Sequence, residues 1–169
     1  MSNYSVYPPT EICAVCGGYC CKHMGCHYSP TDFSDLSFEA LKSQIEKGGI
    51  SIDWWVSGGT REYYLRARHV GEPVVKGSWG GRCVNLTDTG CSLSWEERPL
   101  GGKALKPQSK VGEGCHGYYS KEQCKDDWKP YAQVLQELVG YFGEEETGTF
   151  AELMEAMEAM TRRILDGLD

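Results

Sequence analysis

Nine cysteines in 169 residues are the side chains of this sequence best suited to chemistry. Four of them lie close together in the run Cys13-Ala-Val-Cys16-Gly-Gly-Tyr-Cys20-Cys21. Thiolates that converge on one point repel each other unless a cation lies between them. The two-residue spacing of Cys13 and Cys16 lets both thiols bind one ion, and the doublet that follows adds further sulfur. The sequence therefore predicts a metal-binding protein.

Disulfides are the other common use of many cysteines, and they form in oxidising compartments that a secretory signal gives access to. Residues 1–10 hold neither a basic segment nor an apolar one, and the number of cysteines is odd. Adjacent Cys20 and Cys21 are also an awkward start for two unstrained bridges. We therefore expect a cytoplasmic protein whose cysteines bind metal.

Adjacent side chains tend to point apart, so Cys20 and Cys21 are not expected to bind the same single zinc ion. Either they serve two different ions, or both touch one multi-iron cluster. Cys26 follows soon after, between His23 and His27, and these two histidines are interpreted as exposed loop residues rather than ligands.

A second group of cysteines lies far along the chain. Cys83 and Cys91 bracket a segment that suits two strands joined by a turn, which would return the second thiol beside the first. Cys115, next to His116, follows a long loop and is a further ligand candidate. Cys124 falls inside a predicted helix and is interpreted as an ordinary helical cysteine.

The order of these motifs resembles the YkgJ-type cysteine-cluster family, which is described as zinc- or iron-chelating and sometimes as iron–sulfur. The resemblance rests on Cys13-x2-Cys16-x3-Cys20-Cys21, followed by Cys83-Val-Asn-Leu-Thr-x3-Cys91-Ser-Leu-x3-Glu97-Arg98-Pro99. It covers roughly residues 13–115. It implies that the chelating positions include Cys13, Cys16, Cys20, Cys21, Cys83 and Cys91.

The chain departs from that family after Arg98-Pro99, where many members carry a further cysteine and this chain has Leu100-Gly101-Gly102. Cys115 is the candidate to supply the missing ligand. Arg98 itself either donates N–H groups to the thiolates or pairs with a neighbouring glutamate at the surface. The complete set of predicted metal ligands is Cys13, Cys16, Cys20, Cys21, Cys26, Cys83, Cys91 and Cys115.

The formal net charge of −7 argues against a general nucleic-acid groove, which needs Lys and Arg gathered on one face. No apolar run is long enough to span a bilayer. The expected partner is therefore the metal ion, with a possible protein partner along the C-terminal helices.

The sequence pattern predicts that the elements positioning these cysteines form an α+β fold. We expect a small Cys-rich, metal-stabilised domain with short strands and a helical C-terminal third. We expect one domain over residues 1–169, with a cysteine-cluster region at about 11–118 and a helical region at about 119–168. A helix should end at Lys47 after an N-cap at Asp32 or Ser34, and strands should follow at 50–56 and 62–70.

Shorter strands are expected at 74–75 and 82–86, and residues 99–114 should form a loop or an extended segment. Ser120 should cap a helix that runs to about Val139 with a break near Lys129, because Pro130 falls inside it. Thr149 should cap a final helix with an apolar, Met-rich face, which is either core or a partner interface.

Two functions follow from sulfur-only ligation. The first is a structural zinc site in a binding or scaffold protein, with zinc as the favoured metal because the thiols come from two separate parts of the sequence. The second is a 4Fe-4S cluster in an electron-transfer protein or an oxidoreductase-type enzyme. The sequence assigns no catalytic residue, so whether the protein is an enzyme stays open.

Overall fold

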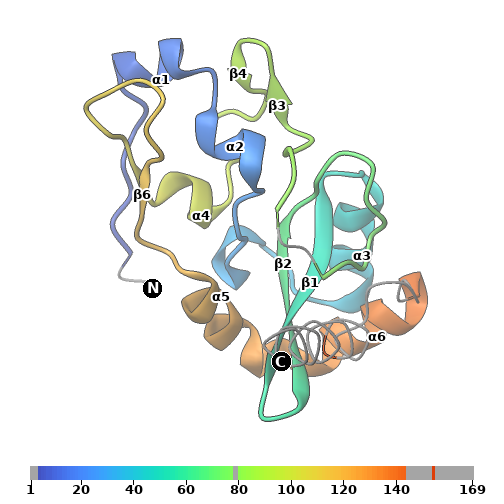
Figure 1. Cartoon of the computed structure of the whole chain (residues 1–169). Coiled ribbons are helices and arrows are strands. Elements are labelled where there is room, and N and C mark those ends of the chain that lie inside the picture. The colour runs from blue at the N-terminus through green and yellow to red at the C-terminus, as the bar shows by residue number, and fades with distance from the viewer. Residues whose placement is uncertain (1–3, 78–79, 144–153, 155–169) are drawn as a thin grey trace, which may run out of the picture.

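The structure, a computed structural model, describes residues 4–77, 80–143 and 154, and within them short helices combine with two-stranded antiparallel sheets (Figure 1). In chain order the elements are α1 (Glu11–Cys16), α2 (Tyr19–His23), the 3-10 helix η1 (Pro30–Asp32), α3 (Phe38–Glu46), β1 (Ile50–Ser57), β2 (Thr60–Ala67), β3 (Leu86–Thr87), β4 (Gly90–Cys91), α4 (Leu100–Lys103), β5 (Leu105–Lys106), β6 (His116–Gly117), α5 (Lys121–Trp128), the 3-10 helix η2 (Lys129–Tyr131) and α6 (Ala132–Phe142). This mixture confirms the predicted α+β class with short strands, whereas its stabilisation by metal stays a prediction.

The longest strands, β1 and β2, form one antiparallel hairpin, in which Ile50 lies opposite Ala67 and Ser57 opposite Thr60. The turn between them is Gly58-Gly59, and both glycines have positive φ angles, of 57° and 81°. Two successive positive φ angles are the geometry of the tight hairpin turn that matches the twist of the strands. Both predicted strands are thus present, although β2 begins and ends two to three residues earlier than the sequence suggested.

The first five residues of β1, from Ile50 to Trp54, are all buried, so neither face of this part of the strand is open to water. Side chains alternate between the faces of a strand. Ile50, Ile52 and Trp54 therefore share the apolar face, and Ser51 and Asp53 share the other face, which we call the polar face of the hairpin.

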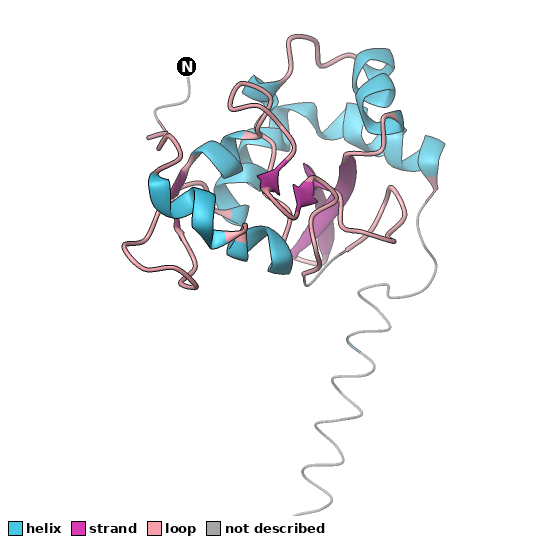
Figure 2. Cartoon of the chain, turned by 90° about the horizontal axis from the view of Figure 1, so that it is seen from above, coloured by secondary structure: helices cyan, strands magenta, loops and turns pink. Residues whose placement is uncertain are grey.

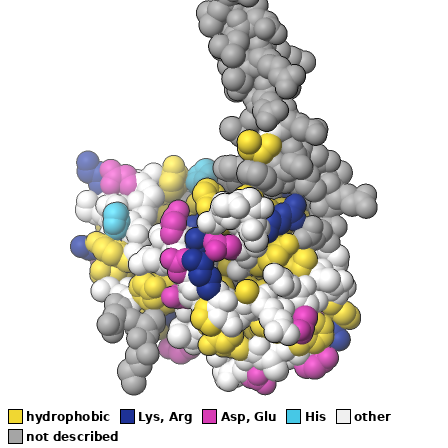
Figure 3. Space-filling model, turned by 90° about the horizontal axis from the view of Figure 1, so that it is seen from below, with side chains coloured by type: hydrophobic (Ala, Val, Ile, Leu, Met, Phe, Trp, Pro, Cys, Tyr) yellow, Lys and Arg dark blue, Asp and Glu magenta, His cyan; other side chains and the backbone are white. Residues whose placement is uncertain are grey.

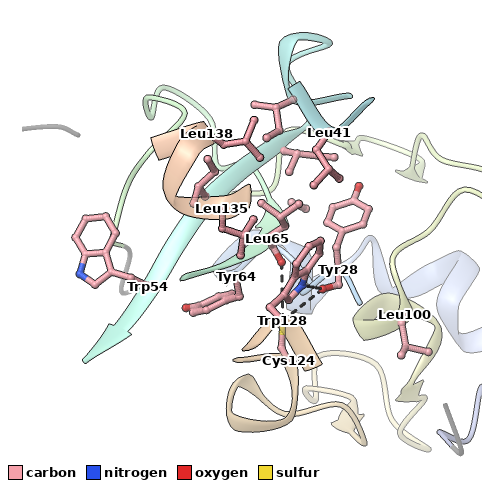
Figure 4. Packing of buried hydrophobic residues seen from close by; sticks show 14 of the residues in the cluster. Tyr28, Leu41, Trp54, Tyr64, Leu65, Leu100, Cys124, Trp128, Leu135 and Leu138 are labelled. Atoms are coloured by element: carbon pink, nitrogen blue, oxygen red, sulfur yellow. Dashed lines mark hydrogen bonds between the residues drawn. The ribbon is translucent and has the colours of Figure 1, made fainter. Parts of the chain in front are cut away.

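The apolar core packs against the hairpin and draws on α3, α5 and α6 (Figure 4). Its centre holds fully buried Leu41 of α3, Leu65 of β2, and Leu135 and Leu138 of α6. Trp128 lies among them and donates its indole N–H to the carbonyl oxygen of Tyr28 at 2.8 Å.

The helix expected before the hairpin is present as α3, but its cap was wrongly placed at Asp32 or Ser34. It begins at Phe38, and the hydroxyl of Ser37 accepts the N–H of Ala40 at 3.4 Å. Asp32 instead accepts the backbone N–H of Ser29, at 2.8 Å, within the turn of η1.

In the second half of the chain, Ser120 caps α5 as predicted, and the expected break occurs at Lys129–Tyr131 before α6 continues. Residues 99–114 include the extended strand β5 as expected, but the short helix α4 within them was not predicted. Of the shorter strands expected, Val75 makes an isolated bridge with Ile52, and Cys83 makes one with His69. The final helix predicted from Thr149 lies outside the described residues, apart from Met154.

The cysteine-bearing elements lie to one side of the hairpin. In Figure 1, α1, α2, α4 and β3 to β6 gather on that side, whereas α3 and α6 lie on the other. Figure 2 shows helices on both sides of the strands when the molecule is seen from above. The fold thus separates a helix-covered apolar core from a region of short elements that carries the thiols.

Basic and acidic side chains lie next to one another on the face shown in Figure 3. Ion pairs of this kind include Lys125 with Glu62 and Lys129 with Asp126, each at 2.8 Å. The described residues of that face therefore present no continuous basic surface for a phosphate backbone. Among the described residues, no helix combines the length and the apolar character that crossing a membrane requires.

Candidate functional site

The connection between α1 and α2 brings the first four cysteines together. Cys13 and Cys16 are three residues apart in α1 and therefore lie on the same side of that helix. Gly17 and Gly18 both have positive φ angles, of 63° and 70°. A Cβ on Gly18 would also lie only 2.4 Å from Cδ1 of Leu86. This close reversal of the chain requires glycine, and it returns the next pair of thiols beside the first.

Six cysteines line one cavity of about 290 Å³, which we call the first cysteine cavity. They come from α1, α2, β4 and the residue before β6: Cys13, Cys16, Cys20, Cys21, Cys91 and Cys115. The backbone N–H of Cys115 donates to Sγ of Cys20 at 3.2 Å, across 95 positions of sequence. Burial, followed by the charge of the Cys20 thiolate, raises the pKa of Cys115 to about 11. Only a nearby positive charge would favour several thiolates here at once.

The second cysteine cavity is smaller, at about 80 Å³, and adjoins the first. It is lined by four cysteines: Cys21, Cys26, Cys83 and Cys91. The backbone N–H of Cys83 donates to the carbonyl oxygen of Cys21 at 2.8 Å, which fixes these two segments against each other. A hydrogen bond from the Cys26 thiol lowers the pKa of Cys21 to about 7, and the same bond raises the pKa of Cys26.

The adjacent thiols make different contacts, although both line the first cavity. Cys20 lines the first cavity and contacts Cys115, whereas Cys21 reaches the second and contacts Cys26. The predicted return of the chain after Cys83 is also present, since Leu86 pairs with Cys91 in the β3–β4 hairpin. All eight predicted ligands therefore line one or both cavities.

Arg98 lines both cysteine cavities. Its Nε donates to the carbonyl oxygen of Leu93 at 3.4 Å, and its guanidinium lies 5.9 Å from the centre of the Trp95 ring. Within the described part of the chain no carboxylate forms an ion pair with Arg98, and its side chain lines the same cavities as the thiols. Its charge is one cause of the lowered pKa of Cys21.

Cys124 stands apart from the other eight cysteines, as its helical position suggested. It is completely buried in the apolar core, where its Sγ donates to the carbonyl oxygen of Tyr28 at 3.4 Å (Figure 4). Burial raises the pKa of its thiol well above the ordinary value. It therefore acts as a packing residue.

The histidines near the cysteines differ in exposure. His23 and His116 are exposed and make edge-on ring contacts with Tyr19 and Tyr118, with ring centres 5.0 Å and 4.7 Å apart. His27 was expected to be an exposed loop residue, but it is partly buried, and burial lowers its pKa to about 4. Its imidazole is therefore neutral at physiological pH.

The sequence did not predict a buried network of charges that lies next to the second cysteine cavity. Arg66 Nε donates to Asp53 at 2.7 Å and its other nitrogens donate to Glu72, while the Nε2 of His69 accepts the backbone N–H of Gly25 at 2.8 Å. Glu72 also lies within 3.3 Å of His69. The network thus holds the residue that precedes Cys26. One signal was available, because Asp53 and Arg66 place opposite charges among the apolar residues of two neighbouring strands.

As the side chains stand, no three Cys, His, Asp or Glu residues among those described are arranged to hold a metal ion. The donor set nevertheless suits one, because all nine cysteines are free thiols and eight of them line two adjoining cavities. Comparison of the chain with protein-family models, curated proteins and solved structures gives no match. The resemblance to the YkgJ-type family therefore stays a prediction.

Proposed function

We propose that this protein binds two metal ions through cysteine thiolates and that zinc holds the cysteine-bearing segments together. The observation that supports this is the division of eight thiols between two adjoining cavities. If the second cavity uses its four cysteines, Cys13, Cys16, Cys20 and Cys115 remain for the first. Each set matches the four ligands of a structural zinc site.

Binding requires the thiols to turn toward common points, because they do not converge as they stand. Rotation about a single side-chain torsion moves a sulfur by a few ångströms, and the cavities leave room for it. When bound, zinc would supply the positive charge that eight thiolates need, and Arg98 would add to it.

A structural role fits the weak packing of the cysteine-bearing helices. Neither α1 nor α2 contains a fully buried residue. Helices this short are not stable on their own in water. Because apolar burial contributes little here, metal–thiolate bonds would supply the missing stabilisation.

An iron–sulfur cluster that serves electron transfer is the second candidate. The size of the first cysteine cavity, about 290 Å³, and its six cysteine neighbours favour it. A single zinc ion with four thiolates at about 2.3 Å would need much less space. A four-iron cluster also takes four thiolates, so it uses the same residues.

Metal analysis and visible absorption after anaerobic purification without a metal-binding tag test both candidates. We expect about two zinc ions per chain and no colour. Cys115→Ser and Cys26→Ser should each lose about one zinc, and Cys124→Ser, the matched control, should keep both. Iron with equimolar acid-labile sulfide and a brown solution would favour the cluster instead. Metal-free protein with its thiols paired in disulfides would refute both.

A further inference from the structure

Of the eight cysteines that line the two cysteine cavities, Cys26 and Cys83 line the second alone. They come from distant parts of the chain, and neither belongs to a helix or to one of the strands β1 to β6. A four-thiolate zinc site needs its ligands at fixed distances and angles. Another part of the fold must therefore hold these two segments in place.

His69 holds the segment of Cys83 through its backbone. The two residues form an isolated antiparallel bridge, and beside it the N–H of Val70 donates to the carbonyl oxygen of Arg82 at 2.8 Å. Residues directly opposite each other in an antiparallel pair project their side chains to the same face. The His69 ring also packs on Gly81, where a Cβ would lie 2.9 Å from its Cγ. The imidazole therefore lies on the same side of this ladder as the Cys83 thiol.

The side chain of His69 holds the segment of Cys26. Its Nε2 accepts the backbone N–H of Gly25 at 2.8 Å in a buried hydrogen bond. The carbonyl oxygen of Cys26 in turn accepts the backbone N–H of Ala67 at 2.8 Å. Hydrogen bonds on either side thus fix the Gly25–Cys26 unit, and His69 connects this unit to the segment of Cys83.

The position of the ring proton follows from these partners. A backbone N–H can only donate, so Nε2 carries no proton and the proton of the neutral ring lies on Nδ1. Nδ1 lies 3.3 Å from the carboxylate of Glu72, and the side chain of His69 is buried. Because both ring nitrogens have partners within the protein, His69 is not a metal ligand in this arrangement.

We infer that His69 positions Cys26 and Cys83 for the second metal, acting through Gly25 and through its own backbone rather than by binding the metal. The inference rests on the proposed function. Partners that orient metal ligands from outside typically contribute a factor of about 10–100 to metal affinity. The four ligands proposed for the first metal lie outside these two segments, so the effect should be confined to the second metal.

Two substitutions separate the hydrogen bond to Gly25 from the rest of the side chain. In His69→Asn the amide lies near the position of Nδ1, so it can still donate to Glu72 but is too short to reach Gly25. In His69→Gln the longer side chain brings its amide oxygen to the position of Nε2, where it can accept the Gly25 N–H. Both replacements are polar, so they differ mainly in this one bond.

Zinc affinity is measured by competition with a coloured chelator, in chains that also carry Cys115→Ser, which keeps the second zinc alone, or Cys26→Ser, which keeps the first alone. We expect His69→Asn to weaken the second zinc about tenfold or more and His69→Gln to recover most of that loss. Neither should change the first zinc. Trp128→Phe is the control for general destabilisation, since it removes a hydrogen bond from the apolar core and should leave both affinities unchanged.

Equal weakening of both zinc ions, an unchanged second affinity, or His69→Gln as weak as His69→Asn would overturn the role of His69. Absence of zinc from the parent chain would refute the proposed function as well, so the two failures are distinguishable. Nitrogen NMR of the imidazole in the zinc-loaded chain without substitutions does not depend on the folding of a variant. We expect the proton on Nδ1, and a proton or a metal on Nε2 would overturn the inference.

Discussion

Replacing Glu72 by Gln should destabilise the protein strongly, in spite of the close similarity in shape. The carboxylate accepts hydrogen bonds from Arg66 at 3.0 Å and from the backbone N–H of His69 at 2.8 Å, and its side chain is only 10% exposed. Burial alone would raise its pKa, but hydrogen bonds to the His69 side chain, to Arg66 and to the His69 backbone N–H prevail and lower it from 4.5 to about 2. The folded state therefore favours the charged form.

The size of the effect follows from that shift. A difference of about 2.5 pKa units corresponds to about 3 kcal/mol of unfolding free energy at neutral pH. Removing one partner of a buried ion pair generally costs about 3–5 kcal/mol, because the other charge stays buried without compensation. This magnitude agrees with the value obtained from the pKa. Because the folded pKa is depressed, this contribution is complete above pH 4.5 and is lost as the pH falls toward 2. Near pH 3 only about half should remain.

Urea unfolding monitored by tryptophan fluorescence, at pH 7 and at the lowest pH where the protein still folds, measures the difference between the two proteins. Glu39→Gln is the control, since Glu39 is 79% exposed and its pair with Lys42, at 3.8 Å, lies at the surface. It should change the unfolding free energy by less than about 0.5 kcal/mol. A loss below about 1 kcal/mol for Glu72→Gln at pH 7, or one that does not shrink with acid, would refute this account of the network.

Two further substitutions test the packing, each by urea unfolding. Gly25→Ala should lower the unfolding free energy by about 2 kcal/mol or more, because its Cβ would lie 2.2 Å from the carbonyl oxygen of Ala67. Gly140→Ala, in α6 with open space around it, should raise the unfolding free energy by up to about 1 kcal/mol. Equal effects of the two would contradict the close approach at Gly25. Trp128→Phe should lower the unfolding free energy by about 2–3 kcal/mol, since it removes the indole N–H bond to Tyr28 and leaves a void. A loss under about 0.5 kcal/mol would show that neither the bond nor the packing contributes to stability.

Elements with a strong local signal could be predicted from the sequence. Ser120 before a helix and Pro130 within it determine the start of α5 and the break before α6, because capping and the missing proline N–H act over a few residues. The pair Gly58-Gly59 is a further local signal, since it directly follows the end of β1 at Ser57. By contrast, the helices α1 and α2 lack a periodic apolar face, and nothing in their local pattern indicated a helix.

The division of the cysteines could be predicted only in part. Adjacent side chains point apart for local reasons, so the different contacts of Cys20 and Cys21 were foreseeable. That Cys115 joins Cys20 depends on how β6 returns past α2, which involves contacts across 95 positions. The buried Asp53–Arg66 pair was missed for a related reason, since the alternating pattern of β1 suggests a solvent-exposed face, and only the tertiary fold covers it.

The uneven distribution of apolar burial makes metal removal a local test of the fold. The hairpin residues Ile52, Tyr64 and Leu65 are completely buried, whereas α1 and α2 contain no buried residue. Stability differs along a chain according to such contacts. Chelation of the proposed metal should therefore speed amide hydrogen exchange about tenfold or more in residues 11–26 while the protection of β1 and β2 persists. Uniform loss of protection over both regions would mean that the metal supports the whole fold, and unchanged exchange in 11–26 would remove its structural role.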